Sequence, residues 1–372
     1  MIYKSFQNIK LSALGVGTMR LPILDGDNSK IDMDTTRKMV KYAIDSGVNY
    51  FDTAWMYHKG NSELAIGEVL KEYPRESFYL ASKFPGFGKD NLSKVEEIFE
   101  RQLEKCQVEY FDFYLFHNVC EDNIDGYLDP KYGIFDYLMK QKENGRIRHL
   151  GFSTHGSLET MKRFLDAYGK DMEFCQIQLN YLDYKLQDAK AKLELIANYN
   201  LPVWVMEPVR GGRLASLEAE DEAALKALRP DHTVPEWAFR FLQGIDAVTM
   251  TLSGMSNMAQ LEENIKTFCE EKPLNDKEFS AVMEIVERMI ARSAIPCTSC
   301  RYCVDKCPRG LDIPTIMAAY NEYFKTQDKD FLYALDKEKS PATCIGCRAC
   351  ERLCPQGIKI SEVMSRIANI TK

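Results

Sequence analysis

The sequence predicts an α/β fold, a (β/α)8 TIM barrel followed by a small, mainly helical domain. Three observations support this prediction. Short apolar segments alternate with amphipathic helical segments through the first 290 residues, eight cysteines gather beyond residue 296, and 372 residues are enough for about two domains. We therefore place the barrel at residues 1–290 and the small domain at residues 291–372.

Eight short apolar segments have the character of buried strands, and helical segments separate them. Strict alternation of strands and helices produces a parallel sheet, and eight repeats near 250 residues fit a closed barrel better than an open, doubly wound sheet. A Rossmann fold would need a G-x-G-x-x-G loop after the first strand, and this sequence has none there. The predicted strands are residues 11–16, 49–53, 78–82, 112–116, 147–152, 174–179, 202–206 and 247–252.

Capping signals indicate where several helices begin and end. Asp34 is expected to cap the first helix, and Ser93 with Glu96 matches a capping box before another. Gly145 is a typical residue just after a helix C-terminus, and Pro235 suits a first helical turn.

Eight cysteines form two runs with the same C-x2-C-x2-C-x3-C-P spacing, which is typical of [4Fe–4S] cluster binding. In two-cluster ferredoxins the fourth cysteine of each run ligates the other cluster. The sequence therefore predicts a ferredoxin-like iron–sulfur domain with two [4Fe–4S] clusters. Structural zinc is the alternative, but zinc needs neither the third cysteine nor the C-P ending. The predicted ligand sets are Cys297, Cys300, Cys303 and Cys354, and Cys344, Cys347, Cys350 and Cys307.

The segment between the two runs, residues 308–343, is longer than the connection of small ferredoxins. Pro314 suits a helix start. Apolar residues then follow at helical spacing, so we expect the helical type of two-cluster ferredoxin. These residues are Ile316, Met317, Tyr320 and Phe324.

Composition limits the classes of partner. The net charge of −7 and the lack of a basic stretch argue against nucleic acid. No apolar run is long enough for a membrane span or a signal peptide, so we expect no membrane and a cytoplasmic location. Exposed clusters would favour an organism that lives with little oxygen, an anaerobe. The other four cysteines are expected to be buried free thiols: Cys106, Cys120, Cys175 and Cys269.

Polar side chains follow three consecutive predicted strands. Asp52 and Tyr57 follow the second strand, Lys83 the third, and His117 the fourth. Chemistry in (β/α)8 barrels takes place at the C-terminal strand ends, so these side chains should meet at one mouth. The motifs D-T-A-x-x-Y, N-S-E and F-D-F-Y-L-F-H resemble those of the aldo-keto reductases, over roughly residues 1–290. This resemblance implies an NAD(P)-dependent oxidoreductase that uses these four residues.

The residue types suit the reduction of a carbonyl group. An aldehyde or ketone that accepts a hydride needs a proton on its oxygen, and Tyr57 is the expected donor. A free phenol has a pKa near 10, which the Lys83 ammonium would lower. Asp52 would keep Lys83 charged and in place, and His117 would orient the carbonyl oxygen.

The resemblance also implies a nicotinamide nucleotide site. Ser153 and Gln176 would contact the carboxamide, and Met206 would provide a face for the ring. A loop after the seventh strand would cover the pyrophosphate, and the helix after the eighth would hold the adenosine. The expected cofactor residues are Gly17, Thr18, Met19, Ser153, Gln176, Met206, Pro208, Arg210, Gly212, Ser253, Gly254, Ser256, Gln260, Glu263 and Asn264.

NADP is the expected cofactor and NAD the alternative. Family members often hold the 2′-phosphate with a lysine and an arginine, and the aligned positions here are Gly254 and Gln260. Arg20 lies at the same mouth and could meet a phosphate or an anionic substrate. The substrate pocket is expected to be lined by Trp55, His58, Lys59 and residues 118–132, which include Tyr127.

The leading hypothesis is an enzyme that reduces a small carbonyl substrate, with clusters available for electron transfer. The alternative is an electron-transfer or redox-sensing iron–sulfur protein, whose barrel binds nucleotide or a partner without turnover. Nicotinamide gives two electrons as a hydride, whereas a [4Fe–4S] cluster takes one at a time. Exchange between them would need a flavin, or an electron-transfer protein such as a ferredoxin or flavoprotein. The sequence predicts neither the substrate nor the oligomeric state.

Overall fold

The computed structural model describes residues 1–292 and 294–371, and its contacts divide the chain into two compact units. The first unit consists of Met1–Val209 and Pro235–Asn275, and the second of Arg210–Val234 and Asp276–Lys372. This grouping differs from a simple boundary after residue 290, because the segment that follows the seventh barrel strand and the last helix before the cysteines pack with the C-terminal part.

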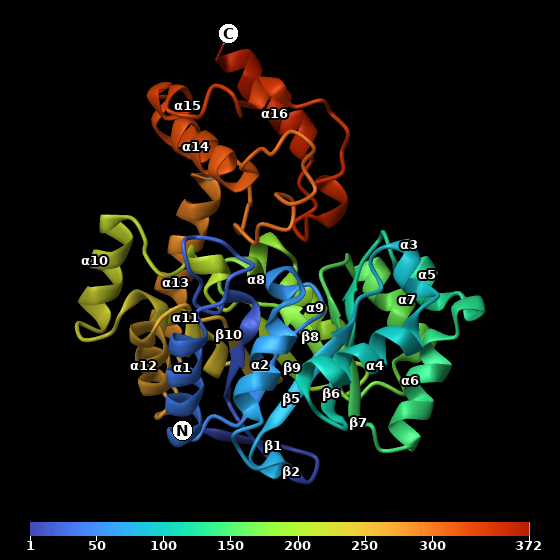
Figure 1. Ribbon diagram of the computed structural model, residues 1–372. Helices are drawn as coiled ribbons and strands as arrows, with labels where there is room; N and C mark the ends of the chain where they lie inside the picture. The colour runs from blue at the N-terminus through green and yellow to red at the C-terminus, as the bar shows by residue number, and fades with distance from the viewer. Residues whose placement is uncertain (293, 372) are drawn as a thin grey trace. The chain divides into compact units, whose positions relative to one another are not determined.

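Eight parallel strands close into a barrel in the first unit, as predicted (Figure 1). Each barrel strand pairs with the next along the chain, and the last pairs with the first, so every strand is hydrogen-bonded on both edges. The order around the barrel is β10-β3-β4-β5-β6-β7-β8-β9. The strands are β3 (Leu14–Gly17), β4 (Tyr50–Asp52), β5 (Tyr79–Phe84), β6 (Phe111–Val119), β7 (Ile147–Thr154), β8 (Cys175–Gln178), β9 (Val203–Met206) and β10 (Val248–Ser253).

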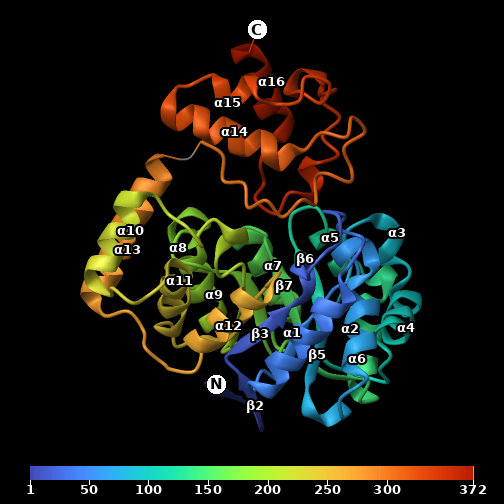
Figure 2. The same ribbon diagram turned by 60° about the vertical axis from the view of Figure 1, so that its left-hand side comes forward.

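Helices surround the strands, as Figures 1 and 2 show. Their apolar faces pack against the barrel, which is the arrangement that alternating strand and helix patterns predict. The longer helices of this unit are α1 (Met33–Asp45), α2 (Ser62–Leu70), α4 (Val95–Cys106), α6 (Ile134–Glu143), α7 (Leu158–Tyr168), α9 (Ala189–Ala197), α11 (Val234–Gln243) and α12 (Met258–Thr267). Short helices lie in the loops: α3 (Lys89–Leu92), α5 (Ile124–Leu128) and α8 (Asp183–Leu186).

An antiparallel hairpin that was not predicted closes the N-terminal end of the barrel. It consists of β1 (Tyr3–Phe6) and β2 (Ile9–Ser12), so the predicted strand 11–16 is in fact the end of β2 and all but the last residue of β3. Phe6 packs edge-on against Trp204, with ring centroids 5.1 Å apart. Phe6 also belongs to a core of side chains from inside the barrel. The hairpin therefore seals this end with apolar side chains.

Two of the predicted helix caps are wrong, and two are confirmed. Asp32, not Asp34, caps α1 by accepting a hydrogen bond from the Thr35 backbone nitrogen at 3.0 Å. Ser93 ends α3 and caps nothing, because α4 begins after Lys94 without a side-chain cap. Gly145 follows the end of α6 with φ +74, and Pro235 lies in the first turn of α11, as expected.

The second unit is mainly helical. Its helices are α10 (Ala219–Leu228), α13 (Asp276–Ala291), α14 (Ile313–Thr326), α15 (Asp330–Tyr333) and α16 (Ile360–Ile370). As predicted, Pro314 lies in the first turn of α14, and apolar residues of α14 and α16 share one core with Cys303 and Cys350. Among the helices of residues 1–292 and 294–371, none is long and apolar enough to cross a membrane.

Candidate active site and cysteine sites

The structure brings the four predicted catalytic residues together at the C-terminal end of the barrel. Asp52 is the last residue of β4, Lys83 lies in β5, and His117 lies in β6. Tyr57 begins a short 3-10 helix (Tyr57–Gly60) in the loop after β4. The strands are neighbours and parallel, so their ends place these side chains over one mouth.

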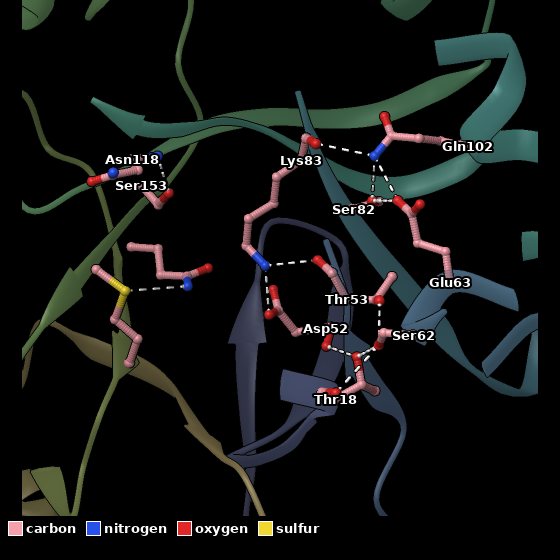
Figure 3. A network of polar contacts seen from close by, with 12 residues as sticks. Thr18, Asp52, Thr53, Ser62, Glu63, Ser82, Lys83, Gln102, Asn118 and Ser153 are labelled. Carbon is pink, nitrogen blue, oxygen red and sulfur yellow. Dashed lines mark hydrogen bonds and ion pairs between the residues drawn. The ribbon is translucent and has the colours of Figure 1, made fainter. Parts of the chain in front are cut away.

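A buried ion pair lies at the centre of this group (Figure 3). The Lys83 Nζ donates to Asp52 Oδ1 at 2.6 Å and to the Thr53 carbonyl oxygen at 2.8 Å. Lys83 is 0% exposed and Asp52 is 3% exposed. Burial raises the pKa of Asp52 and lowers the pKa of Lys83, and each partner opposes the shift of the other. The pair thus holds a lysine ammonium whose proton is easier to lose than that of a lysine in water.

Tyr57 lies against both Lys83 and His117. The Lys83 Nζ is 5.1 Å from the centroid of the Tyr57 ring, and the Tyr57 and His117 rings are 6.2 Å apart at an interplanar angle of 83°. Tyr57 is 8% exposed, so its side chain is buried except for a small accessible part. The phenol ring thus lies beside both the buried Lys83 ammonium and the His117 imidazole.

His117 is held as a neutral imidazole. Burial lowers the pKa of His117 well below its usual value, and the nearby Lys83 and His155 act in the same direction. Within the described part of the chain, its Nδ1 atom has no hydrogen-bond partner. One ring nitrogen can therefore donate to a substrate oxygen while the ring stays uncharged.

Tyr127 does not line a substrate pocket, contrary to the prediction. Its hydroxyl instead holds together the backbone at Gly86 and His117, on either side of this site. It is 1% exposed, and its hydroxyl donates to the His117 carbonyl oxygen at 2.7 Å and accepts from the Gly86 backbone nitrogen at 3.0 Å. A Cβ atom on Gly86 would lie 2.2 Å from the Tyr127 ring, so only glycine fits there. His58 is also structural, because its Nε2 accepts from the Leu21 backbone nitrogen at 3.1 Å.

A second buried ion pair, which sequence reasoning missed, supports the first. Glu63 is 0% exposed, and its Oε2 accepts from Lys105 Nζ at 2.6 Å. Its Oε1 accepts from Ser82 Oγ at 2.7 Å and Gln102 Nε2 at 2.6 Å. Gln102 Nε2 also lies 3.0 Å from the Lys83 carbonyl oxygen (Figure 3), so the network fixes the strand that carries Lys83. Glu63 belongs to the N-S-E motif, but its partners in α4, Gln102 and Lys105, are distant in sequence, so the motif alone does not reveal the ion pair.

Lys105→Met is expected to destabilise the protein by about 3–5 kcal/mol, because it leaves the Glu63 carboxylate buried without its cation. The measurement is the free energy of unfolding in denaturant. The double variant Glu63→Gln/Lys105→Met should recover part of the loss, since it removes the uncompensated charge. Equal stability of Lys105→Met and the unmodified protein would contradict this account.

The three predicted nicotinamide contacts lie on consecutive strands. Ser153 is in β7, Gln176 in β8, and Met206 at the end of β9. Ser153 Oγ accepts from the Asn118 backbone nitrogen at 2.8 Å, and Gln176 Nε2 lies 3.7 Å from Met206 Sδ. The Gln176 Oε1 atom is buried and, among described residues, has no hydrogen-bond partner. It can accept a hydrogen bond from a bound amide.

The predicted adenosine residues gather where β3 and β10 end. Ser253 Oγ accepts from Asn264 Nδ2 at 3.1 Å, and the Ser256 backbone nitrogen donates to Gln260 Oε1 at 2.8 Å. The other residues of this corner are Gly17 at the end of β3, Met19 in the following turn, Gly254 after β10, Glu263 in α12, and Thr18, whose hydroxyl donates to the Asp52 carbonyl oxygen at 2.9 Å.

The predicted pyrophosphate loop is divided between the two units. Pro208 is buried in the first unit, whereas Arg210 and Gly212 belong to the second. Arg210 is 0% exposed, and its Nη2 donates to the Pro296 carbonyl oxygen at 3.2 Å and to Gln356 Oε1 at 3.3 Å. The guanidinium thus forms hydrogen bonds with residues next to the two cysteine runs. The spacing of residues in the sequence does not reveal these contacts.

The eight cysteines of the two runs line two separate cavities in the second unit. We call them site I and site II. Each cavity takes three cysteines from one run and the fourth from the other, as the crossed ligation predicts. Site I is lined by Cys297, Cys300, Cys303 and Cys354, and site II by Cys344, Cys347, Cys350 and Cys307.

Burial makes the thiols of the two sites harder to ionise. Burial and the neighbouring site I cysteines raise the pKa of Cys303, and burial raises the pKa of Cys350 to about 11. These thiols lose their protons readily only when metal cations replace them. Each cavity offers four cysteine thiols, a donor set that fits an iron–sulfur cluster.

The four remaining cysteines are only partly as expected. Cys106 and Cys175 are buried, and burial raises the pKa of both thiols well above the usual value. Cys120 is half-buried, whereas Cys269 is exposed, contrary to the prediction that it is buried.

Comparison with known proteins agrees with this fold and site. A barrel that carries this group of residues at its mouth defines a class of NAD(P)-dependent oxidoreductases. Residues 13–287 match the aldo/keto reductase family, and residues 296–358 match the 4Fe-4S dicluster domain. The chain belongs to the aldo/keto reductase family and carries a 4Fe–4S dicluster domain.

Relatives resemble the barrel part of the chain. The uncharacterized oxidoreductase YqkF of Bacillus subtilis (strain 168) is 23% identical over 77% of this chain and 96% of its own length. The NADH-specific methylglyoxal reductase of Escherichia coli (strain K12) is 24% identical over 76% of this chain and 97% of its own. The structure of aldo-keto reductase AKR11C1 from Bacillus halodurans (holo form) has the same fold, with a TM-score of 0.63 and 24% identity, over 77% of this chain and 96% of that one.

Proposed function

We propose that the barrel reduces an aldehyde or ketone at the expense of NADPH or NADH, with Tyr57 as the proton donor. The observation that carries this proposal is the buried Asp52–Lys83 pair directly beside the Tyr57 ring. A structural role alone would be served equally well by apolar side chains, because a buried ion pair seldom adds stability over them.

Each of the four side chains has its own role in the proposed carbonyl reduction. When bound, reduced nicotinamide supplies the hydride. The Tyr57 hydroxyl gives its proton to the carbonyl oxygen, and the Lys83 ammonium stabilises the phenolate that remains. Asp52 keeps Lys83 in position at 2.6 Å. Neutral His117 donates a hydrogen bond to the same oxygen without adding charge.

Arg20 supports the choice of NADPH over NADH. The side-chain stem of Arg20 packs on Gly254, where a Cβ atom would lie 3.2 Å from it, and Ser256 Oγ donates to the Arg20 carbonyl oxygen at 2.9 Å. The stem of Arg20 thus starts in the corner where the resemblance places the adenosine, whereas Gly254 and Gln260 carry no charge. A phosphate on the ribose would be attracted to the Arg20 guanidinium.

We propose that sites I and II hold two [4Fe–4S] clusters, because each offers four cysteines in one cavity. Electron exchange between the clusters and nicotinamide would require a flavin, or a partner such as a ferredoxin or flavoprotein, to convert single electrons into a hydride. The second function that this arrangement favours is electron transfer through the clusters, with the barrel as the nucleotide-binding part.

The test is anaerobic and uses the full chain after cluster reconstitution. The oxidation of NADPH and of NADH is followed by the near-UV absorbance of the reduced nicotinamide, with a panel of small aldehydes and ketones as substrates. The panel includes methylglyoxal, because one relative is named a methylglyoxal reductase. We expect turnover with at least one carbonyl compound and a lower KM for NADPH. The proposal of carbonyl reduction fails if none of these compounds is reduced while chemically reduced clusters, with added flavin, reduce NADP. Electron transfer would then be the function.

A further inference from the structure

Sites I and II have loops of the same spacing, and one of the differences between them lies at the residue after the first cysteine. The residue after the first cysteine is Thr298 in site I and Ile345 in site II. The backbone that follows has the same left-handed conformation in both, with φ +54 at Ser299 and +67 at Gly346. The two loops can therefore be compared position by position. After the first cysteine, site I has the hydroxyl group of Thr298, whereas site II has the apolar side chain of Ile345.

Thr298 places a hydroxyl group inside the protein beside the site I cysteines. It is 2% exposed, and it lines the site I cavity. Its Oγ1 atom is buried and has no hydrogen-bond partner in the part of the chain that the structure describes. Burial of an unsatisfied hydroxyl is unfavourable, so a partner is expected in the filled cavity. A sulfur atom of a bound cluster is an acceptor there. Ile345, by contrast, is 64% exposed.

Arg210 brings a buried positive charge to the same site. Its hydrogen-bond acceptors include the carbonyl oxygen of Pro296, the residue before Cys297, and the side chain of Gln356, two residues after Cys354. One guanidinium therefore joins the two segments that supply site I with its cysteines. Arg210 also shares the wall of a cavity of about 430 Å³ with Cys297 and Thr298.

We propose that Thr298 and Arg210 raise the reduction potential of the cluster at site I above that of the cluster at site II. Reduction adds one electron and makes the cluster more negative. A hydrogen-bond donor and a cation both stabilise that added charge, and hydrogen bonds to the sulfurs and local charge are known determinants of cluster potential. This inference does not depend on the reaction in the barrel.

The experiment is an anaerobic redox titration of the reconstituted full chain, followed by electron paramagnetic resonance. A Cys347→Ala variant, which lacks a site II ligand, identifies the signal of site I. In the unmodified protein the site I signal should appear first as the potential is lowered. Thr298→Val removes the hydroxyl at nearly constant volume, and it should shift the one-electron equilibrium at site I about tenfold toward the oxidised form, which corresponds to about 59 mV.

Three further variants distinguish a specific effect on the reduction potential of site I from a general disruption of the domain. Thr298→Ser keeps the hydroxyl and should keep the potential, whereas Ile345→Val, the matched change at site II, should change neither signal. Arg210→Gln should lower the potential of site I in the same direction as Thr298→Val. The proposal fails if site II is reduced first in the unmodified protein. It also fails if both Thr298→Val and Arg210→Gln leave the site I potential unchanged.

Discussion

Tyr57→Phe is expected to lower kcat for carbonyl reduction by about 10²–10⁴-fold, the usual contribution of a positioned acid. Phenylalanine keeps the ring and its contacts with Lys83 and His117 but cannot give a proton. The affinity for the nucleotide should remain, because the nicotinamide contacts that we propose lie on other strands. The measurements are steady-state rates and the dissociation constant of NADPH, obtained from quenching of protein fluorescence.

Two other variants sharpen this test. Lys83→Met should give a comparable loss of kcat, since the phenolate would form without a nearby cation. Tyr79→Phe is the matched control, because Tyr79 begins β5 at the opposite end of the barrel from Lys83 and should leave the rate unchanged. Turnover of Tyr57→Phe within threefold of the unmodified enzyme would rule out Tyr57 as the proton donor.

The second large effect concerns the crossed cysteine sites. Cys354→Ala and Cys300→Ala should abolish the same cluster, although Cys354 belongs to the second run, because both cysteines line site I. Each variant should bind about half of the iron of the unmodified protein, and the remaining resonance signal should be the same in both. Cys307→Ala should instead match Cys347→Ala, since these two line site II.

Cys269→Ala provides the control for cysteine replacement, because Cys269 is exposed and lies outside both sites. It should retain all of the iron. If Cys354→Ala shared its remaining signal with Cys347→Ala, each run would ligate its own cluster and the crossing would be wrong. Loss of all iron from every single variant would show that the two sites assemble only together.

The features that the sequence predicted well depend on local periodicity and fixed spacing. Eight apolar segments became the eight barrel strands, and the ends of three of them brought Asp52, Lys83 and His117 together. The position of Cys354 in site I followed from the spacing of the runs. Each of these predictions needs only the pattern of one segment and a general rule for how such segments assemble.

The features that were missed depend on contacts between distant segments. Lys105 could not be assigned to Glu63 from the sequence, because nothing local distinguishes it from an exposed helical lysine. Arg210 was assigned to a nucleotide loop, and only the folded chain shows its guanidinium on Pro296 and Gln356. The hairpin β1–β2 was missed because its side chains alternate weakly, and its apolar contacts come from the barrel interior.

The crossing of the two cysteine runs has a consequence for biosynthesis. When the first run leaves the ribosome, it carries only three of the four thiols that site I requires, and the last arrives with Cys354. Site II needs Cys307 from the earlier run as well as Cys350 from the later one. Iron delivered too early would meet Cys297, Cys300, Cys303 and Cys307 alone, a complete but wrongly paired set. Maturation should therefore succeed best when iron–sulfur insertion follows translation of the second run.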